Sequence, residues 1–393
     1  MKLKILELFG GIGACSKALE RLGIDYEIAD YVEIDKYAVK SFNAIHNTNF
    51  EPQDVCKWDK DIEVDLVMHG SPCQDFSLAG NQAGGDEGSG TRSSLMYETI
   101  RIVEKLKPKY VIWENVKNVI SKKHKHNFDN YCNKMNELGY RNYAQVLNAK
   151  DYGIPQNRER VFTISIRKDI DKDFQFPPKQ KLKLKLKDML EDEVEEKYYL
   201  SDEQCKLIQA QLNNKSTLLI DNCQARREGK PREYNNISPT ISARDYKEPR
   251  CIQIGNLEGG KWNKINESCR RVYSEEGLSP TIHTCQGGNT EPKVIGGVGG
   301  KKSNNGTQWY QQDRIYDNNV GLSLSTTALP YYPDKELRIR KLTPKECWRL
   351  MGFDDEDFDK ASKVNSNTQL YKQAGNSIVV NVLEGILKEL LCK

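Results

Sequence analysis

The sequence lacks the features of several protein classes. Its 11 cysteines form no Cys-x-x-Cys pair and no secretory leader is recognisable, so we expect reduced thiols and no disulfide framework or zinc site. No apolar run approaches the ~18 residues that a membrane-spanning helix needs. The net charge is only +3, so any surface that binds nucleic acid is expected to be a local patch. These absences predict a cytoplasmic protein without a metal ion.

A cysteine stands in the most informative short motif of the chain. The tetrapeptide Ser71-Pro72-Cys73-Gln74 follows the apolar run 65–70, which predicts a short buried strand ending in a turn. The glycine-rich residues 80–91 come next and favour a mobile loop. A cysteine in a turn that proline makes rigid, at the end of a strand, is well placed to be a nucleophile. A buried structural thiol is the commoner role of a single cysteine, so the other motifs must decide.

A glycine-rich turn near the N-terminus predicts a ligand at a helix start. The run Phe9-Gly10-Gly11-Ile12-Gly13 follows a predicted strand at 4–8 and opens a predicted helix at 14–22, which Gly23 ends. Glycines at this position let a ligand approach the backbone. Many strand-to-helix turns contain such glycines, so the turn alone is a weak signal.

Three acids stand where a nucleoside-containing cofactor needs them. Glu33 and Asp35 follow the next strand, where a carboxylate can bind ribose hydroxyls. Asp54 follows a turn that contains proline, in position to accept from an adenine amino group. Each could instead be a solvated surface acid, but their joint placement favours the cofactor.

A glutamate and two arginines lie at two further strand ends. The apolar strand 110–116 carries Glu114 near its tip, where a carboxylate is unfavourable unless it is paired or used. Arg158 and Arg160 flank Glu159 at the start of the strand 161–166, and could be ordinary surface ion-pair partners. In an α/β sheet, these side chains and Cys73 would meet at the rim where such sheets bind ligands.

Taken in order, these motifs resemble those of the DNA cytosine-5 methyltransferases of bacteria and phages, over nearly the whole chain. Residues 9–13 resemble the first S-adenosylmethionine block, 72–74 the nucleophile block, 114–116 the glutamate block and 156–160 the arginine block. Near the C-terminus, 340–353 resemble the helix that supports a recognition domain, and 373–377 the closing block. The resemblance implies an α/β fold: a doubly wound, Rossmann-like, S-adenosylmethionine-dependent methyltransferase sheet with an inserted, β-rich, smaller recognition domain.

The resemblance also implies a reaction and its residues. Cys73 would be the nucleophile that adds to C6 of a flipped cytosine, and Glu114 would bind N3 and the exocyclic amine. Arg160, and with it Arg158, would hold the O2 side of the base. The other residues that the resemblance assigns would bind S-adenosylmethionine: Phe9, Gly11, Ile12, Gly13, Glu33, Ile34, Asp54, Val55, Pro72, Asn376 and Ser377.

The chain is long enough to hold two domains. We expect a catalytic and cofactor-binding domain at 1–178 completed by 366–393, a recognition domain at 190–340, and a supporting helix and connector at 341–365. The second domain contains an internal repeat, because residues 234–241 recur at 273–282 and, degraded, at 316–326. Each copy predicts a β-rich hairpin with an exposed loop.

These loops are the predicted nucleic-acid contacts. Arg244 and Lys247 in the first loop, with Arg270 and Arg271 next, carry groups suited to phosphates and base edges. A purely architectural repeat is the alternative. We expect a monomer that modifies specific sites in double-stranded DNA, for restriction-modification or phage self-protection, with any restriction endonuclease acting separately. A tRNA cytosine-5 methyltransferase and a catalytically inactive DNA-binding relative are the other two hypotheses. The long segment 190–340 argues against the first, and the presence of Cys73, Glu114 and Arg160 against the second.

Overall fold

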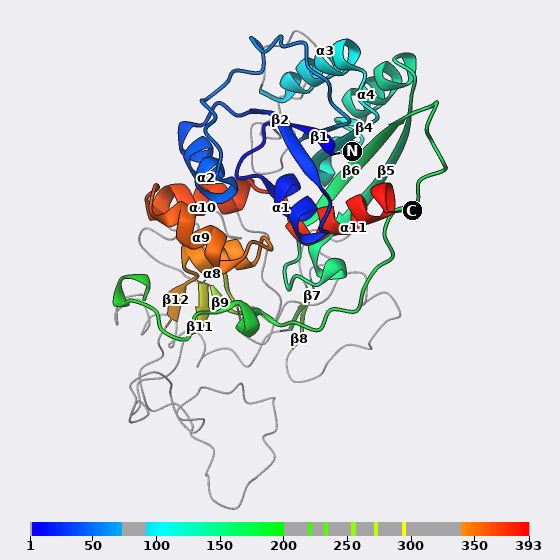
Figure 1. Cartoon of the computed structure of the whole chain (residues 1–393). Helices are drawn as coiled ribbons and strands as arrows, with labels where there is room; N and C mark the ends of the chain where they lie inside the picture. The colour runs from blue at the N-terminus through cyan, green and yellow to red at the C-terminus, as the bar shows by residue number, and fades with distance from the viewer. Residues whose placement is uncertain are drawn as a thin grey trace, which may run out of the picture. The chain divides into compact units, whose positions relative to one another are not determined.

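The chain divides into two compact units (Figure 1). The computed structural model describes residues 2–72, 92–199 and 342–392, and six short strands between residues 219 and 341. One unit comprises Met1–Leu184 and Trp348–Lys393, and the other comprises Lys185–Cys347. The domain limits expected from the sequence, at 178, 190–340 and 366, remain predictions.

The first unit is built on a mixed six-stranded sheet. Its strands stand in the order β2-β1-β3-β4-β6-β5, where β1, β2, β3 and β4 are parallel and β6 is antiparallel to both of its neighbours. The strand bounds are Leu3–Leu8 (β1), Tyr26–Val32 (β2), Leu66–His69 (β3), Tyr110–Val116 (β4), Tyr140–Asn148 (β5) and Glu159–Arg167 (β6). The chain leaves β1 toward β2 on one side and returns as β3 on the other. The strand order therefore reverses at the carboxyl ends of β1 and β3, which is where ligands bind in open α/β sheets.

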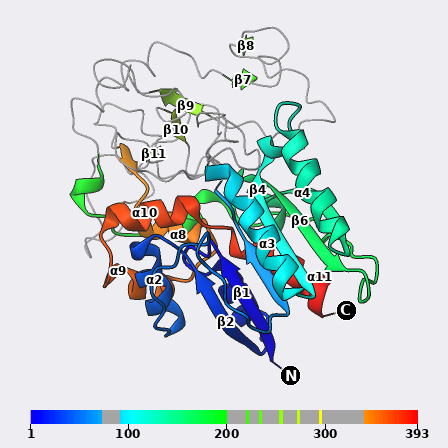
Figure 2. The ribbon, with the colours of Figure 1, turned by 90° about the horizontal axis from the view of Figure 1, so that it is seen from above.

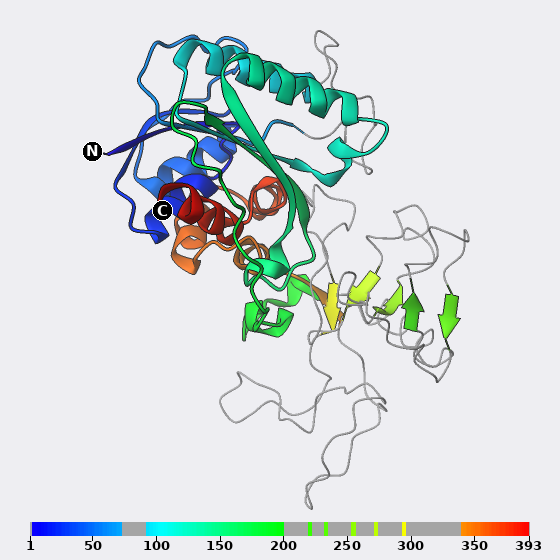
Figure 3. The ribbon, with the colours of Figure 1, turned by 90° about the vertical axis from the view of Figure 1, so that its right-hand side faces the viewer.

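Helices cover both faces of this sheet, as the doubly wound prediction requires (Figures 2 and 3). Figure 3 shows α3 and α4 on one face and α1 and α11 on the other. The α-helices among the described residues are α1 (Ala14–Arg21), α2 (Lys36–His46), α3 (Met96–Leu106), α4 (Lys125–Glu137), α8 (Pro344–Arg349), α9 (Asp355–Ser362), α10 (Asn367–Asn376) and α11 (Val380–Leu391). Short 3-10 helices lie at Arg92–Leu95, Lys117–Ile120, Ala149–Tyr152, Leu186–Met189 and Glu196–Tyr198.

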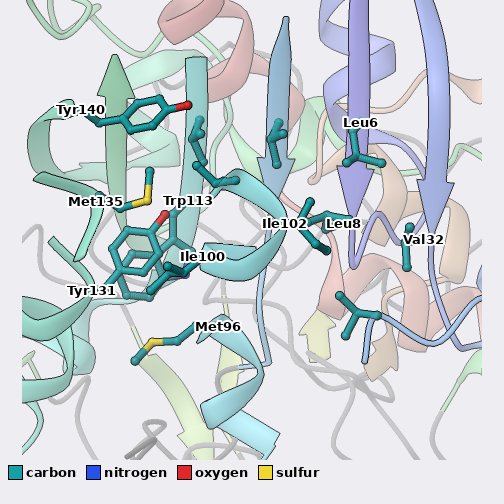
Figure 4. Close-up of a cluster of buried hydrophobic side chains, with 14 of the residues drawn as sticks. Leu6, Leu8, Val32, Met96, Ile100, Ile102, Trp113, Tyr131, Met135 and Tyr140 are labelled. Carbon is teal, nitrogen blue, oxygen red and sulfur yellow. The ribbon is translucent and has the colours of Figure 1, made fainter. Parts of the chain in front are cut away.

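A hydrophobic core lies between the sheet and the helices α3 and α4 (Figure 4). Leu6, Leu8 and Val32 face it from β1 and β2, and Trp113 faces it from β4. Alternate residues of a strand point to opposite faces, so Ile5, Ile112 and Glu114 belong to the face that carries α1 and α11. Both faces are therefore buried, which explains why these strands are continuous apolar runs in the sequence.

The C-terminal helices join the first unit through a buried lysine. Lys17 of α1 is 5 % exposed, and its Nζ lies 2.9 Å from Asp354 and 3.1 Å from Asp357, at the start of α9. Arg21, one turn further along α1, pairs with Asp354 and with Glu384 of α11. The two ends of the chain thus form one fold.

In the second unit the structure describes six short strands. The strands are β7 (Leu219–Asp221), β8 (Arg232–Tyr234), β9 (Gln253–Asn256), β10 (Arg271–Tyr273), β11 (Lys293–Ile295) and β12 (Ile339–Lys341). β10 and β11 pair in parallel, and β7 and β8 form a separate two-stranded sheet. The repeat cores and loops fall almost wholly in 235–252, 274–292 and 296–338, outside the described residues. The hairpin in each repeat therefore stays a prediction.

Candidate active site

Four strand ends converge at one edge of the sheet in the first unit. The register pairs Leu8 with Val32 and with His69, and pairs His69 with Trp113, so the ends of β1, β2, β3 and β4 lie in one row. The residues that follow this row carry most of the predicted site: the glycine turn after β1, Glu33 after β2, the Ser71-Pro72 segment after β3 and Glu114 on β4. Of the side chains predicted to share a rim, Glu114 and Arg160 lie together there, and Cys73 lies outside the described residues.

The glycine turn has three residues in the left-handed region of the backbone, two of them glycines. Phe9, Gly11 and Gly13 have φ angles of 53°, 56° and 82°, in the left-handed region. A Cβ on Gly11 would meet no atom within 4 Å, whereas a Cβ on Gly13 would lie 2.2 Å from Nε2 of His46. Gly11 thus presents an open side, and Gly13 is required by the protein's own packing. This second reason for glycine at position 13 was not visible in the sequence.

Glu33 is bonded to the glycine turn. Its Oε2 accepts from the Gly11 amide at 3.1 Å, and its Oε1 accepts from the Asp35 amide at 2.9 Å. Burial raises the pKa of the Glu33 carboxyl above its ordinary value. Ile34, the next residue, has 70 % of its surface exposed. A polar carboxylate beside an exposed apolar side chain is a combination that can hold a sugar and a flat ring.

The other acids of this region have different surroundings. Asp35 caps α2, since it accepts from the Tyr37 amide at 2.9 Å, and it also pairs with Lys372 of α10 at 2.6 Å. Asp54 is half-buried and accepts from the Cys56 amide at 3.0 Å. Of the two acids after β2, Asp35 therefore has a structural role, and Glu33 remains the candidate for the ligand.

Glu114 and Arg160 form an ion pair at the end of β4. Nε of Arg160 lies 3.0 Å from Oε1 of Glu114, with 18 % and 12 % of the two side chains exposed. The antiparallel register pairs Val116 with Arg160, which brings the two charges together. Burial raises the pKa of the Glu114 carboxyl, while Arg160 and Arg158 oppose that rise. The pair joins a carboxyl group of raised pKa to a guanidinium that orients it.

Arg158 has a different environment from Arg160. It is 4 % exposed, and its Nη2 donates to the carbonyl oxygens of Gly375 at 3.1 Å and Ser377 at 2.8 Å. These carbonyls lie at the turn from α10 to α11, so Arg158 holds the closing block in place. Its guanidinium bonds to the backbone of the closing block, whereas that of Arg160 pairs with the Glu114 carboxylate and also donates to the Glu159 carbonyl oxygen.

The closing block reaches the same rim. A Cβ on Gly70 would lie 3.6 Å from Cδ1 of Ile378 and 3.7 Å from Oε2 of Glu114. Asn376 is exposed and Ser377 is 7 % exposed. The segment that follows α10 therefore lies beside the ends of β3 and β4. The sequence interpretation placed the closing block at the cofactor site, on the same edge of the sheet.

Several predicted site residues lie outside the described residues. These are Cys73, Arg244, Lys247 and Arg270, and of Arg271 only the backbone in β10 is described. Pro72, Ile12 and Val55 are described, and Ile12 and Val55 are buried. Among the residues that the structure describes, no group of His, Cys, Asp and Glu could hold a metal ion.

The sequence interpretation missed Glu7, which lies in β1 beneath the start of α1. Gly13 gives that helix no side-chain cap, and Oε1 of Glu7 instead accepts from the Ser16 amide at 3.0 Å. Glu7 is 2 % exposed, and burial raises the pKa of its carboxyl to about 7. The sequence did contain a signal for Glu7, because a carboxylate in an apolar strand needs a hydrogen-bond or ion-pair partner.

Known proteins are similar to this chain over nearly its full length. A family model described as C-5 cytosine-specific DNA methylase matches residues 3–392. The chain is similar to the orphan methyltransferase M.SPBetaI of Bacillus phage SPbeta, with 33 % identity over 99 % of this chain and 98 % of the relative. It is 31 % identical to the type II methyltransferase M.HhaI of Haemophilus parahaemolyticus, over 98 % and 93 %.

A solved structure shows the same fold. The Entamoeba histolytica methyltransferase EhMeth matches with a TM-score of 0.62 and 15 % identity, over 100 % of this chain and 98 % of its own. The α/β methyltransferase fold expected from the sequence is thereby confirmed. Within the described part of the chain, none of the helices is long and apolar enough to cross a membrane.

Proposed function

The chain belongs to the C-5 cytosine-specific DNA methylase family, and from this premise we propose the roles of its residues in methylating C5 of cytosine in DNA. The observation that carries the proposal is the Glu114–Arg160 pair at the rim, beside the segment that leads to Cys73. A carboxyl of raised pKa can donate a proton or a hydrogen bond. Such a donor suits a cytosine ring that gains negative charge when a nucleophile adds to it.

Cys73 is the proposed nucleophile. C5 of cytosine is too electron-poor to take a methyl group directly, so a thiolate first adds to C6 and makes C5 nucleophilic. After C5 is methylated, a base takes the C5 proton and the electrons of that C–H bond expel the Cys73 thiolate from C6. A thiol has an ordinary pKa of about 8.5, so a nearby cation such as Arg160 would favour the thiolate.

Glu114 is the proposed partner of the ring nitrogen N3. Thiolate addition at C6 builds negative charge at N3, and a protonated Glu114 can neutralise it by donating a proton or a hydrogen bond. Burial raises the pKa of Glu114, which favours the protonated form that this step needs. Arg160 fixes the carboxyl and can donate to O2 of the base. Arg158, whose guanidinium holds the closing block, is proposed as a positioning residue.

The first unit fits S-adenosylmethionine. Gly11 has an open side at a positive φ, Glu33 offers a carboxylate anchored to the same turn, and Ile34 exposes an apolar face beside it. When bound, S-adenosylmethionine supplies a methyl group on a sulfonium. We propose that Glu33 binds its ribose hydroxyls and Ile34 packs on its adenine. The remaining contacts are assigned to Phe9, Ile12, Asp54, Val55, Pro72, Asn376 and Ser377.

The substrate is proposed to be duplex DNA with the target cytosine flipped out of the stack. C6 and C5 cannot be reached by a thiolate inside a base-paired duplex, so the base must enter a pocket. Residues 232–340 are proposed to select the site, with Arg244, Lys247, Arg270 and Arg271 as contacts. The phage and type II names of the relatives support a role in phage self-protection or restriction-modification.

A methyl-transfer assay with the full chain tests the proposal. Duplex DNA should take radiolabel from S-adenosylmethionine and tRNA should not, and bisulfite sequencing should place the label at cytosines of one short site. DNA with 5-fluorocytosine at that site should trap a covalent complex, because fluorine cannot leave as the proton does. Cys73→Ser should abolish the complex. A labelled peptide containing another cysteine, or label on tRNA alone, would contradict the assignment.

A further inference from the structure

The segment that leads to Cys73 is held in the protein interior. His69, the last residue of β3, is 0 % exposed, and Ser71 is 3 % exposed. Cys73 stands two residues beyond Ser71, and two residues span at most ~7 Å. The groups that hold Ser71 therefore limit where the thiolate can be.

Two side chains of β4 hold Ser71. Nε1 of Trp113 donates to Oγ of Ser71 at 3.0 Å, and Nδ2 of Asn115 donates to the Ser71 carbonyl oxygen at 3.3 Å. Trp113 and Asn115 are 1 % and 2 % exposed, so both bonds are shielded from water. Buried bonds of this kind are costly to leave unmade. The hydroxyl and the main chain of Ser71 are both fixed from one strand.

Trp113 is itself immobilised by its neighbours (Figure 4). Its ring centroid lies 4.2 Å from that of Tyr131 on α4 and 5.9 Å from that of His69, whose ring is parallel to it within 1°. Nε2 of His69 bonds to the Tyr131 hydroxyl at 3.0 Å, and its Nδ1 bonds to the Thr99 hydroxyl of α3 at 3.3 Å. Burial lowers the pKa of His69 to about 3, which keeps the ring neutral at physiological pH. The indole is thus fixed to β3, α3 and α4.

Glu114 lies between Trp113 and Asn115 and points to the opposite face of the sheet. The same three residues of β4 therefore carry the proposed acid on one side and the two donors to Ser71 on the other. This arrangement sets the distance between the acid and the segment that ends in the nucleophile.

We propose that Trp113 and Ser71 are positioning residues for the reaction, and that the indole N–H to hydroxyl bond aligns the Cys73 segment with Glu114 for attack on C6. This inference rests on the proposed role of Cys73. A loose segment would let the thiolate miss the near-attack geometry, and a misplacement of 1 Å can lower a rate by about a hundredfold. The competing interpretation is that the bond serves stability alone.

Two substitutions remove the bond, and the volume that the tryptophan substitution removes is matched in a control. Trp113→Phe keeps an aromatic ring against Tyr131 but has no N–H, and Ser71→Ala removes the acceptor. Trp348→Phe is the matched control, because Trp348 is 1 % exposed and its Nε1 donates to the Leu370 carbonyl at 2.9 Å. That carbonyl belongs to α10, and no contact described here links Trp348 to Ser71.

The measurements are the rate of the covalent complex with 5-fluorocytosine DNA, the affinity for S-adenosylmethionine and the urea midpoint of unfolding. Trp113→Phe and Ser71→Ala should each slow complex formation by about ten- to a hundredfold, with cofactor affinity unchanged. The double variant should be no slower than the slower single variant, because both remove one bond. Trp348→Phe should lower the urea midpoint without slowing the complex.

Two results would overturn the inference. One is complex formation at the wild-type rate in both variants. The other is that Trp113→Phe and Ser71→Ala slow complex formation no more than Trp348→Phe does when the loss of stability is equal. The bond would then have a purely structural role. Failure of the proposed function is a separate result, because the wild-type protein would then form no complex at Cys73.

Discussion

The Ser16 amide donates to Oε1 of Glu7, so a carboxylate from near the C-terminal end of β1 caps the helix that begins after the glycine turn. The Ser16 hydroxyl bonds to the same oxygen. A helix start carries unsatisfied N–H groups and a partial positive charge, and Gly13 has no side chain to satisfy them. The glycine turn and its helix are therefore stabilised from beneath by a residue that precedes them.

Glu7 should make stability depend on pH. Its folded pKa of about 7 lies above the ordinary 4.5, so the folded state binds the proton more tightly than the unfolded state. The stabilisation that protonated Glu7 gives the fold is fully present below pH ~4.5. It decreases by about 3 kcal/mol in all as the pH rises to ~7, and above that pH the contribution of Glu7 no longer changes. Glu7→Gln keeps an acceptor and should flatten this slope.

Urea unfolding at pH 5, 6, 7 and 8 measures the effect as a difference between wild type and Glu7→Gln. Glu63→Gln is the control, since that acid is exposed and lies on the surface beside Lys4. An identical slope in wild type and Glu7→Gln would show that Glu7 does not titrate in this range.

Gly11→Ala and Gly13→Ala should separate ligand binding from packing. Both add a Cβ at a positive φ, which costs about 1–2 kcal/mol. At Gly13 the Cβ also meets His46 and Phe42, so Gly13→Ala should lower the urea midpoint strongly. At Gly11 the Cβ meets nothing, so the stability loss should be limited to the backbone term while affinity for S-adenosylmethionine falls. Calorimetry measures the affinity of both variants for S-adenosylmethionine, and urea unfolding measures their stability. Wild-type affinity in Gly11→Ala would show that Gly11 is not part of the cofactor site.

Arg158 and Arg160 should behave oppositely when replaced by alanine. Arg158→Ala leaves the carbonyls of Gly375 and Ser377 buried without that donor, which should cost about 1–3 kcal/mol of stability. Arg160→Ala removes the partner of Glu114, whose pKa should rise further, so that the neutral carboxyl is favoured. Stability should then change little, while the covalent complex forms at least about a hundredfold more slowly. The urea midpoint of unfolding and the rate of covalent-complex formation, measured for both variants, test these expectations. Equal losses of stability in the two variants would contradict the different roles given to Arg158 and Arg160.

Glu114→Gln should lower the rate of methyl transfer by about a hundredfold or more, because an amide cannot supply a proton to N3. Cofactor affinity should stay at the wild-type value, since Glu114 is assigned to the base. Glu159→Gln offers a control on the neighbouring strand, where the acid pairs with Lys117 at the surface. Wild-type turnover in Glu114→Gln would remove it from the mechanism.

Arg244→Ala and Lys247→Ala should show whether the first repeat loop reads sequence. Loss of a base-edge contact relaxes specificity at one position by about 1–3 kcal/mol. Loss of a phosphate contact weakens binding to all sequences and reduces the salt slope by about one unit. Bisulfite sequencing of the methylated sites, with binding measured at several salt concentrations, distinguishes the two. If exchange of 232–340 for the same segment of a relative left the methylated site unchanged, recognition would lie elsewhere.

The sequence by itself determined the order of the motifs, the strands and helices that carry them and the family. Those features depend on local patterns: an apolar strand, a glycine turn, a polar residue at a strand end. Parallel strands then bring such ends to one rim without any further information.

Only the tertiary structure separated residues that look alike in the chain. Arg158 and Arg160 stand in one motif, yet one bonds to the turn after α10 and the other to Glu114. Gly13 needs to be glycine because His46 lies against it, and Ser71 is held by Trp113. Contacts between distant residues depend on how the elements pack, and a local pattern does not encode them.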